Sequence, residues 1–242
     1  MSQICRWGFI GAANIARKNW LAIKNSGNGV VAAVASRKLV SSQAFVDECQ
    51  ATQPFASAPK AIQGYDDLLA LPEIDAVYVP LPTGLRKQWV IRAAQAGKHV
   101  LCEKPCAADA NELREMLAAC RANGVQFMDG VMFMHTQRYR EMRALLDDGS
   151  AIGDIRRIVS QFSFNGGSNF EADNIRLNSV LEPFGALGDL GWYNIRFALW
   201  ALKYEMPQQV AGTMLAERRR GDSPQSVPME ISGELFFRNG VS

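Results

Sequence analysis

The chain carries almost no excess charge, and it lacks long apolar runs. Its 26 Lys and Arg residues are set against 24 Asp and Glu residues in 242, so no strong field favours nucleic acid or an anionic membrane. The one basic run, Arg218-Arg219-Arg220, precedes Gly-Asp-Ser-Pro, which is typical of a solvated loop. No apolar stretch approaches membrane-spanning length, and the first residues lead into a strand without a signal peptide. We expect neither nucleic acid nor a membrane as partner.

Paired cysteines and clustered histidines are also missing. The five cysteines are an odd number and form no Cys-x-x-Cys pair. Cys102 and Cys106 flank a lysine, but the chain has only two histidines to join them, so we expect no metal site. This cysteine usage favours reduced thiols in a cytoplasmic protein.

Apolar runs alternate with amphipathic stretches up to about Gly130, which is typical of βαβ units and a parallel sheet. After Gly130 the pattern changes to that of an antiparallel sheet with helices. We therefore predict an α/β fold: a doubly wound Rossmann domain over 1–130 and an α+β domain with a mainly antiparallel sheet over 131–242. The predicted strands are 6–10, 30–35, 76–79, 99–102, 126–129, 155–164, 209–215 and 229–237. The predicted helices are 15–24, 40–48, 66–71, 85–96, 111–123, 137–146 and 187–202.

The last residues predict a strand that enters a hairpin. Asn239-Gly240 is a dipeptide that supplies the positive φ angles of a tight turn, yet the sequence stops at Ser242. We expect the sheet of the C-terminal domain to be truncated.

The turn from the first strand to the first helix has the composition of a phosphate-binding turn. Against the pattern Gly-x-Gly-x-x-Gly, Gly11 is kept, and Ala13 and Ala16 take the other places around Asn14-Ile15. Small residues let a pyrophosphate approach the backbone and the helix N-terminus. We predict a dinucleotide site here; the alternative is a merely tight turn.

Ser36-Arg37-Lys38 follows the second strand, where an acidic residue would bind the adenosine ribose of NAD. A hydroxyl and two cations suit a 2′-phosphate instead. The cluster favours NADP, with NAD possible as cofactor, unless it is a plain surface loop.

Two further loops follow predicted strands. Pro80-Leu81-Pro82-Thr83 would line the nicotinamide side, or form an ordinary turn in which Thr83 caps a helix beginning near Leu85. Glu103-Lys104-Pro105 places a lysine at the carboxyl end of a strand, where open α/β sheets bind ligands. Lys104 could hold a substrate hydroxyl or lower the pKa of a neighbouring acid.

The second domain offers acidic and aromatic partners. Asp189 and Tyr193 are four residues apart on a predicted helix, so they would share one face. A phenol can exchange a proton when a carbonyl and an alcohol interconvert, provided that a cation lowers its pKa. The alternative is an aromatic helix core. His135, just past the domain junction, could contact substrate, although lone histidines are more often structural.

Four motifs together resemble the glucose-fructose oxidoreductase / inositol dehydrogenase / MocA family. They lie at 11–16, 79–83, 96–105 and 185–193, and the similarity runs over essentially the whole chain. The chain is most similar to the branch of dimeric dihydrodiol dehydrogenase and NADP-dependent D-xylose dehydrogenase.

The resemblance implies a catalytic pair at Lys104 and Tyr193, with Asp189 binding substrate. It also implies a cis bond before Pro105 and a homodimer or higher homo-oligomer through the open sheet of the second domain. Family members usually carry a histidine three residues after the position of Thr83, where this chain has Arg86.

The leading hypothesis is an NADP-dependent oxidoreductase that transfers a hydride between nicotinamide and a sugar or a cyclic diol. The predicted cofactor-binding residues are Gly11, Ala13, Asn14, Ile15, Ser36, Arg37, Lys38, Pro80, Leu81, Pro82, Thr83, Glu103 and Lys104. The alternatives are a non-catalytic NADP(H) sensor and, less favoured, an FAD or S-adenosylmethionine enzyme on a similar sheet.

Overall fold

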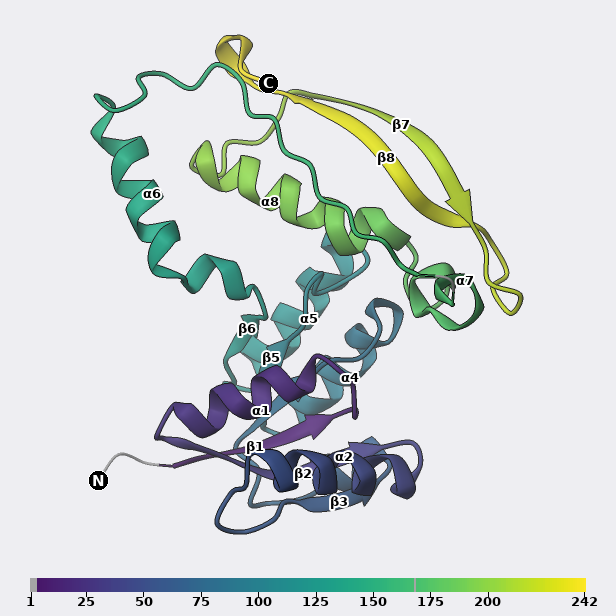
Figure 1. Cartoon of the computed structure of the whole chain (residues 1–242). Helices are drawn as coiled ribbons and strands as arrows, with labels where there is room; N and C mark the ends of the chain where they lie inside the picture. The colour runs from purple at the N-terminus through teal and green to yellow at the C-terminus, as the bar shows by residue number, and fades with distance from the viewer. Residues whose placement is uncertain (1–3, 168) are drawn as a thin grey trace. The chain divides into compact units, whose positions relative to one another are not determined.

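The chain divides into two compact units, Met1–Gly130 and Val131–Ser242. The structure is a computed structural model that describes residues 4–167 and 169–242 (Figure 1). Residues 1–3, part of the predicted direct entry into the first strand, lie outside the described residues.

The first unit is built on a six-stranded parallel sheet, in the order β3-β2-β1-β4-β5-β6. Its order reverses between β1 and β4, as in a doubly wound dinucleotide-binding fold. The strands are β1 (Cys5–Ile10), β2 (Gly29–Ser36), β3 (Lys60–Gln63), β4 (Ala76–Val79), β5 (His99–Cys102) and β6 (Phe127–Asp129). The predicted parallel Rossmann sheet is confirmed.

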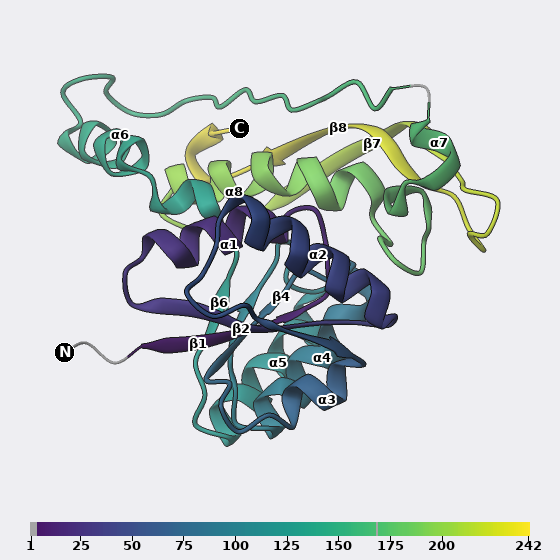
Figure 2. The same ribbon diagram turned by 60° about the horizontal axis from the view of Figure 1, so that its bottom comes forward.

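Helices cover both faces of this sheet. They pack on either side of it, so the first unit has three layers (Figure 2). The helices of the first face are α1 (Ala16–Asn25) and α2 (Leu39–Thr52), and those of the second are α3 (Tyr65–Leu69), α4 (Thr83–Gln95) and α5 (Ala110–Ala122). Gly97 and Gly124 follow α4 and α5 with φ of 72° and 65°, the left-handed conformation in which glycine commonly ends a helix.

Successive side chains of β1 point to opposite faces of the sheet, so each face is packed with different side chains. Phe9 packs with Trp20 and Phe45 under α1 and α2, while Ile10 joins the core under α4 and α5. All four of these side chains are almost completely buried. Burial of such apolar surface is the main force that holds the helices on the sheet.

Two local predictions for the first unit differ from the structure. Strand β3 was missed because its four residues, Lys-Ala-Ile-Gln, have too few apolar residues to show a pattern at the sheet edge. Helix α4 begins at Thr83 with Pro82 in the capping position, so Thr83 is not the cap of a helix that begins near Leu85. Its side chain is buried instead.

The second unit combines helices with a two-stranded antiparallel sheet of β7 (Gln209–Arg218) and β8 (Val227–Phe236). Helix α6 spans Gln137–Asp148, and a short helix α7 spans Phe170–Asp173. The predicted helix at 187–202 consists of a π-helical turn, Leu187–Gly191, that continues into α8 (Trp192–Ala201). The π-helical turn was not predicted, because hydrophobic periodicity does not distinguish one wide turn from α-helix.

The strand predicted at 155–164 does not form. This segment is extended, but a strand needs a partner, and the backbone hydrogen bonds found here join Arg156 and Ile158 to Ser242. The chain does reverse at Asn239-Gly240, where the Phe237 N–H donates to the Val241 carbonyl at 2.9 Å, but the turn has three residues rather than the two of a tight Asn-Gly turn. Residues Arg238–Gly240 form a 3₁₀ turn with Gly240 at φ 73°, and the backbone then runs past Arg156.

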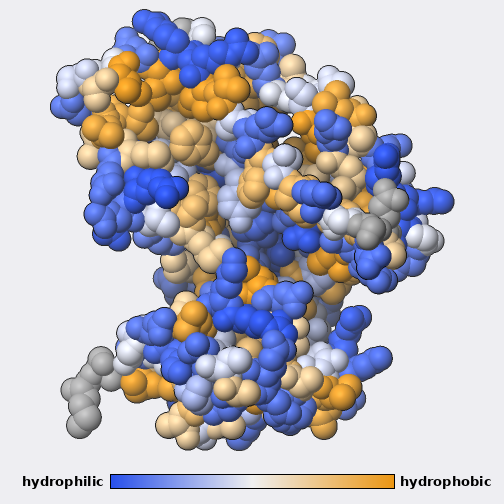
Figure 3. Space-filling view, in the orientation of Figure 1, coloured by the Kyte–Doolittle hydropathy of each residue, from blue (hydrophilic) through white to orange (hydrophobic). Residues whose placement is uncertain are grey.

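Apolar side chains gather on the surface of the second unit (Figure 3). They include Ile152, Val159, Phe162, Phe164, Met206, Val210, Met214 and Leu215. Within the described residues, no helix has both the length and the apolar character that a membrane crossing requires. The same residues contain no group of three or more His, Cys, Asp or Glu side chains that could hold a metal ion.

Candidate active site

The predicted cofactor residues of the first unit follow the carboxyl ends of parallel strands. Gly11 follows β1, Ser36 ends β2, Pro80 follows β4 and Glu103 follows β5. Because all of these strands are parallel, their carboxyl ends meet at one edge of the sheet. The structure therefore places the glycine turn, the basic cluster, the proline loop and Lys104 at a single edge, where such sheets bind ligands.

Gly11 leaves the backbone of the first turn open to a close approach. Its φ is 121°, a conformation that other residues rarely adopt, and its N–H donates to the Ala35 carbonyl at 2.9 Å. A Cβ at this position would come within 3.2 Å of the Leu81 side chain. Among the described residues, no side chain caps the start of α1 at Ile15, although the N–H groups of Ala16 and Arg17 already donate to the carbonyls of Ala13 and Asn14. The backbone of the preceding turn and the positive end of the helix dipole are then what would attract an anion.

Asn14 and Ala13 shape the same turn. The Ala13 carbonyl accepts from the Ala16 N–H at 2.9 Å, which starts the first turn of α1. The Asn14 side chain accepts from the Arg17 guanidinium at 2.8 Å, and Arg17 in turn pairs with Glu48 of α2. The Asn14 side chain is therefore held by α1, and the backbone of the turn is the part suited to contact a pyrophosphate.

Ser36, Arg37 and Lys38 line an open hollow of about 510 Å³ together with Ser41. The hollow lies where β2 ends and α2 begins at Leu39. It combines two exposed cations, two hydroxyl-bearing residues and the N-terminus of a fourteen-residue helix, all of which attract a phosphate. Ser41 was not among the predicted cofactor residues. It lies in the first turn of α2, and the helix places it at the hollow.

Lys104 is half-buried and lies two residues after the end of β5, with a cis bond to Pro105 as the family resemblance implied. Beneath it, the Glu103 side chain is buried rather than facing outward. The Tyr78 hydroxyl donates to Glu103 Oε1 at 2.7 Å, and the Lys104 N–H donates to Oε2 at 3.2 Å. The Glu103 carboxylate thus accepts hydrogen bonds at both oxygens and fixes the loop 103–105 from the buried side.

The Tyr78 hydroxyl stays protonated and keeps donating in this contact. Burial, followed by the Glu103 carboxylate, raises the pKa of Tyr78 far above its usual value. Tyr78 belongs to β4 and Glu103 follows the neighbouring β5, so their hydrogen bond links two strands of the sheet just below the lysine loop.

The proline loop 80–83 turns its side chains inward. Leu81 and Thr83 are 5% and 1% exposed. The Thr83 hydroxyl accepts from the guanidinium of Arg86, which is itself buried. Pro80 is buried as well and Pro82 is half-buried, so this loop presents mainly its backbone, while the Leu81 and Thr83 side chains fix its position.

Asp189 and Tyr193 lie in the second unit on the π-helical turn and the first turn of α8. Asp189 forms an ion pair with Arg176, which sits in a 3₁₀ turn at Ile175–Leu177 and was not predicted as a site residue. Nothing in the sequence pattern singles out this arginine, because it lies thirteen positions before Asp189 and in a different turn of the chain.

Tyr193 is half-buried among aromatic rings. Its ring centroid lies 5.5 Å from both Phe133 and Phe162 and 5.3 Å from Trp192. The aromatic packing expected as the alternative is therefore present around this phenol. His135 ends the 3₁₀ turn Met132–His135 of the same unit and is exposed.

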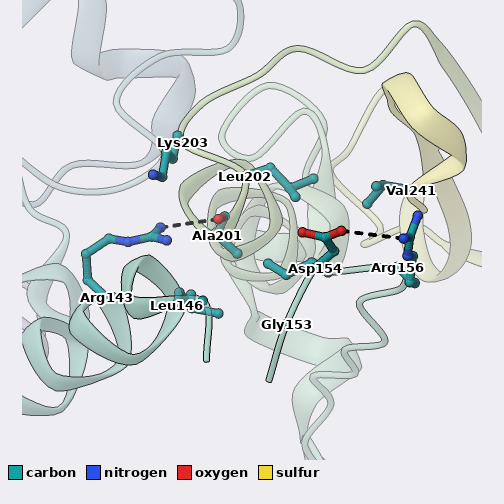
Figure 4. Close-up of a pocket in the computed structure, with 11 residues that line it drawn as sticks. Arg143, Leu146, Gly153, Asp154, Arg156, Ala201, Leu202, Lys203 and Val241 are labelled. Atoms are coloured by element: carbon teal, nitrogen blue, oxygen red, sulfur yellow. Dashed lines mark hydrogen bonds and ion pairs between the residues drawn. The ribbon is translucent and has the colours of Figure 1, made fainter. Parts of the chain in front are cut away.

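A second hollow, of about 530 Å³, lies in the second unit beside the C-terminal end of α8 (Figure 4). Arg143 donates to the carbonyls of Trp200 and Ala201 at 3.1 and 3.2 Å and pairs with Asp147. Arg156 pairs with Asp154. The charged side chains around this hollow are therefore paired with one another or bonded to the carbonyls at the end of α8. None of the predicted site residues is among the residues that line it.

The fold and the cluster of loops at its carboxyl edge define a dinucleotide-binding α/β protein. Residues 5–131 match the model of the GFO/IDH/MocA oxidoreductase family with an NAD-binding Rossmann fold, and residues 139–242 match the C-terminal domain of the same family. The chain belongs to the GFO/IDH/MocA family, which confirms the resemblance.

Three relatives illustrate the range of activities in similar proteins. The chain is 38% identical over 211 residues to a dTDP-3,4-didehydro-2,6-dideoxy-alpha-D-glucose 3-reductase of Streptomyces violaceoruber, covering 87% of the chain and 57% of that enzyme. It is 33% identical to a D-xylose 1-dehydrogenase (NADP(+)) of Haloferax volcanii, covering 98% and 67%.

The third relative is a solved structure of a 3-ketoreductase from Actinomadura kijaniata in complex with NADP and TDP-benzene. It superposes with a TM-score of 0.85 at 31% identity, covering 99% of this chain and 68% of that one. The same enzyme has been solved with one lysine replaced by alanine and with one tyrosine replaced by phenylalanine. The chain thus spans between 57 and 68% of the length of these three relatives.

Proposed function

We propose that the protein is an NADP-dependent oxidoreductase that interconverts a hydroxyl and a carbonyl group on a sugar or a cyclic diol. The observation that carries this proposal is the gathering of a glycine turn, a basic hollow and Lys104 at one edge of the parallel sheet. A sheet edge of this kind offers phosphate sites and a reactive cation together.

The residues at this edge fit NADP. The open backbone at Gly11 and the start of α1 would hold the pyrophosphate, and Ser36, Arg37 and Lys38 would hold the 2′-phosphate. The loop 80–83 and the lysine loop would flank the nicotinamide. When bound, the cofactor supplies or accepts a hydride.

Lys104 and Tyr193 are proposed as the proton-handling pair. In the direction of reduction, the Tyr193 hydroxyl gives its proton to the carbonyl oxygen, and the Lys104 ammonium stabilises the resulting phenolate and orients the oxygen. Asp189 would accept a hydrogen bond from a neighbouring substrate hydroxyl. Glu103, with both oxygens already bonded, supports Lys104 from below.

The first substrates to test are nucleotide-linked keto sugars. Two of the relatives are named for reduction of a sugar ketone, and one of them was solved with a TDP ligand. A free aldose such as xylose comes second, because the Haloferax relative is named for it. Cyclic diols complete the panel.

A homodimer through the sheet of the second unit is part of the proposal. Nine of the ten residues of β7 are exposed in a single chain, among them Val210 and Met214. Apolar side chains exposed along a strand are typical of a surface that another chain covers.

The catalytic assignment is tested by turnover of the full-length protein, followed through the absorbance of NADPH. We expect Lys104→Ala and Tyr193→Phe each to lower kcat by at least about 1000-fold while NADPH affinity stays within about threefold, since a lost proton donor costs roughly this much. Matched controls are Lys60→Ala, which removes an exposed ion pair, and Tyr204→Phe, which alters a half-exposed ring.

Two results would contradict the assignment. Wild-type rates in either variant would remove that residue from the chemistry. Tight NADPH binding without turnover over the whole panel would favour the non-catalytic sensor instead.

A further inference from the structure

Arg86 is a charged side chain buried inside the first unit. It lies in the first turn of α4 and is only 5% exposed. Arginine is rarely buried to this degree unless its N–H groups are hydrogen-bonded, since an uncompensated buried charge is costly. The neighbouring cations of the same helix, Lys87 and Arg92, instead form ion pairs at the surface.

The guanidinium of Arg86 joins two separate loops. Its Nε donates to the Leu81 carbonyl at 2.7 Å, and its Nη1 donates to the Thr83 hydroxyl at 3.1 Å. The same Nη1 also donates to the Pro105 carbonyl in a short contact. Leu81 and Thr83 belong to the loop after β4, whereas Pro105 belongs to the loop after β5.

The Pro105 carbonyl is one residue from Lys104, so this contact bears on the placement of the lysine. On the other side, Glu103 is fixed by Tyr78. The backbone of Lys104 is therefore held between two buried charged side chains, one on each side. The ammonium group at the end of a flexible lysine side chain takes a reproducible position only if the backbone that carries the side chain is fixed.

We propose that Arg86 is a positioning residue that ties the lysine loop to the proline loop and so holds Lys104 in its working position. The inference rests on the proposed function for Lys104. A planar guanidinium with a fork of donors reaches acceptors on both loops, whereas a lysine ammonium, as a point charge, or an imidazole, with two ring nitrogens, cannot reproduce this pattern.

A double-mutant cycle with Lys104 tests whether Arg86 acts through that lysine. We expect Arg86→Met and Arg86→Lys to lower kcat by about 10- to 100-fold in the otherwise wild-type protein, since misplacement of a reacting group by about 1 Å has this effect. In the Lys104→Ala background, Arg86→Met should change kcat by less than about threefold. Arg92→Met on the same helix should leave kcat unchanged.

A second measurement does not depend on turnover. Hydrogen exchange of the full-length protein should be about tenfold faster over residues 103–109 in Arg86→Met and Arg86→Lys, and unchanged over β7. Arg92→Met should leave both segments at the wild-type rate. Arg86→Lys keeps the charge and remains informative if Arg86→Met does not fold.

The outcomes separate this inference from the proposed function. The positioning role would be overturned if hydrogen exchange over 103–109 stayed at the wild-type rate in folded Arg86 variants. It would also be overturned if Arg86→Met lowered kcat by the same factor in the Lys104→Ala background as in the wild-type protein. If the wild-type protein shows no turnover, or if Lys104→Ala is fully active, the proposed function fails, and the exchange rates still decide whether Arg86 ties the two loops.

Discussion

The basic hollow at the end of β2 allows the cofactor preference to be tested directly. Arg37 and Lys38 are exposed cations at this hollow, and NADP differs from NAD only in the 2′-phosphate that we expect them to bind. Arg37→Ala and the double variant Arg37→Ala/Lys38→Ala remove one and two of these charges. The helix N-terminus and the glycine turn remain intact for the part that both cofactors share.

The size of the effect follows from the exposure of these side chains. A hydrogen bond to a charged group contributes about 1.5–3 kcal/mol, and because both cations face water we take the lower end. Since about 1.4 kcal/mol corresponds to a factor of ten, NADP affinity should fall about tenfold in the single variant and about 100-fold in the double variant. NAD affinity should change by less than about twofold.

Calorimetric titration with NADP and with NAD, at low and high salt, measures both affinities. The preference for NADP should shrink at about 1 M salt, where the screening length is only about 3 Å. Arg114→Ala, an exposed arginine on α5, is the matched control. Equal losses for both cofactors, or no loss for NADP, would refute the assignment of this hollow to the 2′-phosphate.

Two further outcomes are expected. Tyr78→Phe removes the donor to the buried Glu103 carboxylate and should lower the free energy of unfolding by about 1–3 kcal/mol in urea denaturation; a change below about 0.5 kcal/mol would show that Glu103 is satisfied without it. Val210→Glu/Met214→Glu should convert the proposed dimer to a monomer in light scattering, because two charges enter the exposed face of β7, while Val40→Glu on α2 should not. A mass equal to that of the wild-type protein in the first variant would contradict the proposed dimer through β7.

Five of the six strands of the first unit could be predicted, because each is a short apolar run between turn residues. The edge strand β3 and the segment 155–164 show the limit of this reasoning. The first has little apolar character but pairs with β2, whereas the second has strand-like composition but pairs with no strand among the residues that the structure describes. Strand formation depends on a pairing partner that local sequence does not contain.

The same distinction holds for the candidate site. Gly11 and the Lys104-Pro105 turn could be located from the sequence, since their position after a strand is a local property. The inward orientation of Glu103 and the contacts of Arg86 could not, because their partners are Tyr78 on another strand and Pro105 nineteen residues away. Arg176 beside Asp189 was missed for the same reason.

The division of β1 between two cores has a consequence for how the protein can change. Phe9 and Ile10 are adjacent in sequence but point into separate packing compartments, so a substitution in one compartment leaves the contacts of the other intact. Substitutions at Trp20 or Phe45 can therefore leave the aliphatic layer beneath α4 and α5 intact. Tyr78 limits this freedom, because it belongs to the aromatic layer and also donates to Glu103, so it couples that layer to the lysine loop.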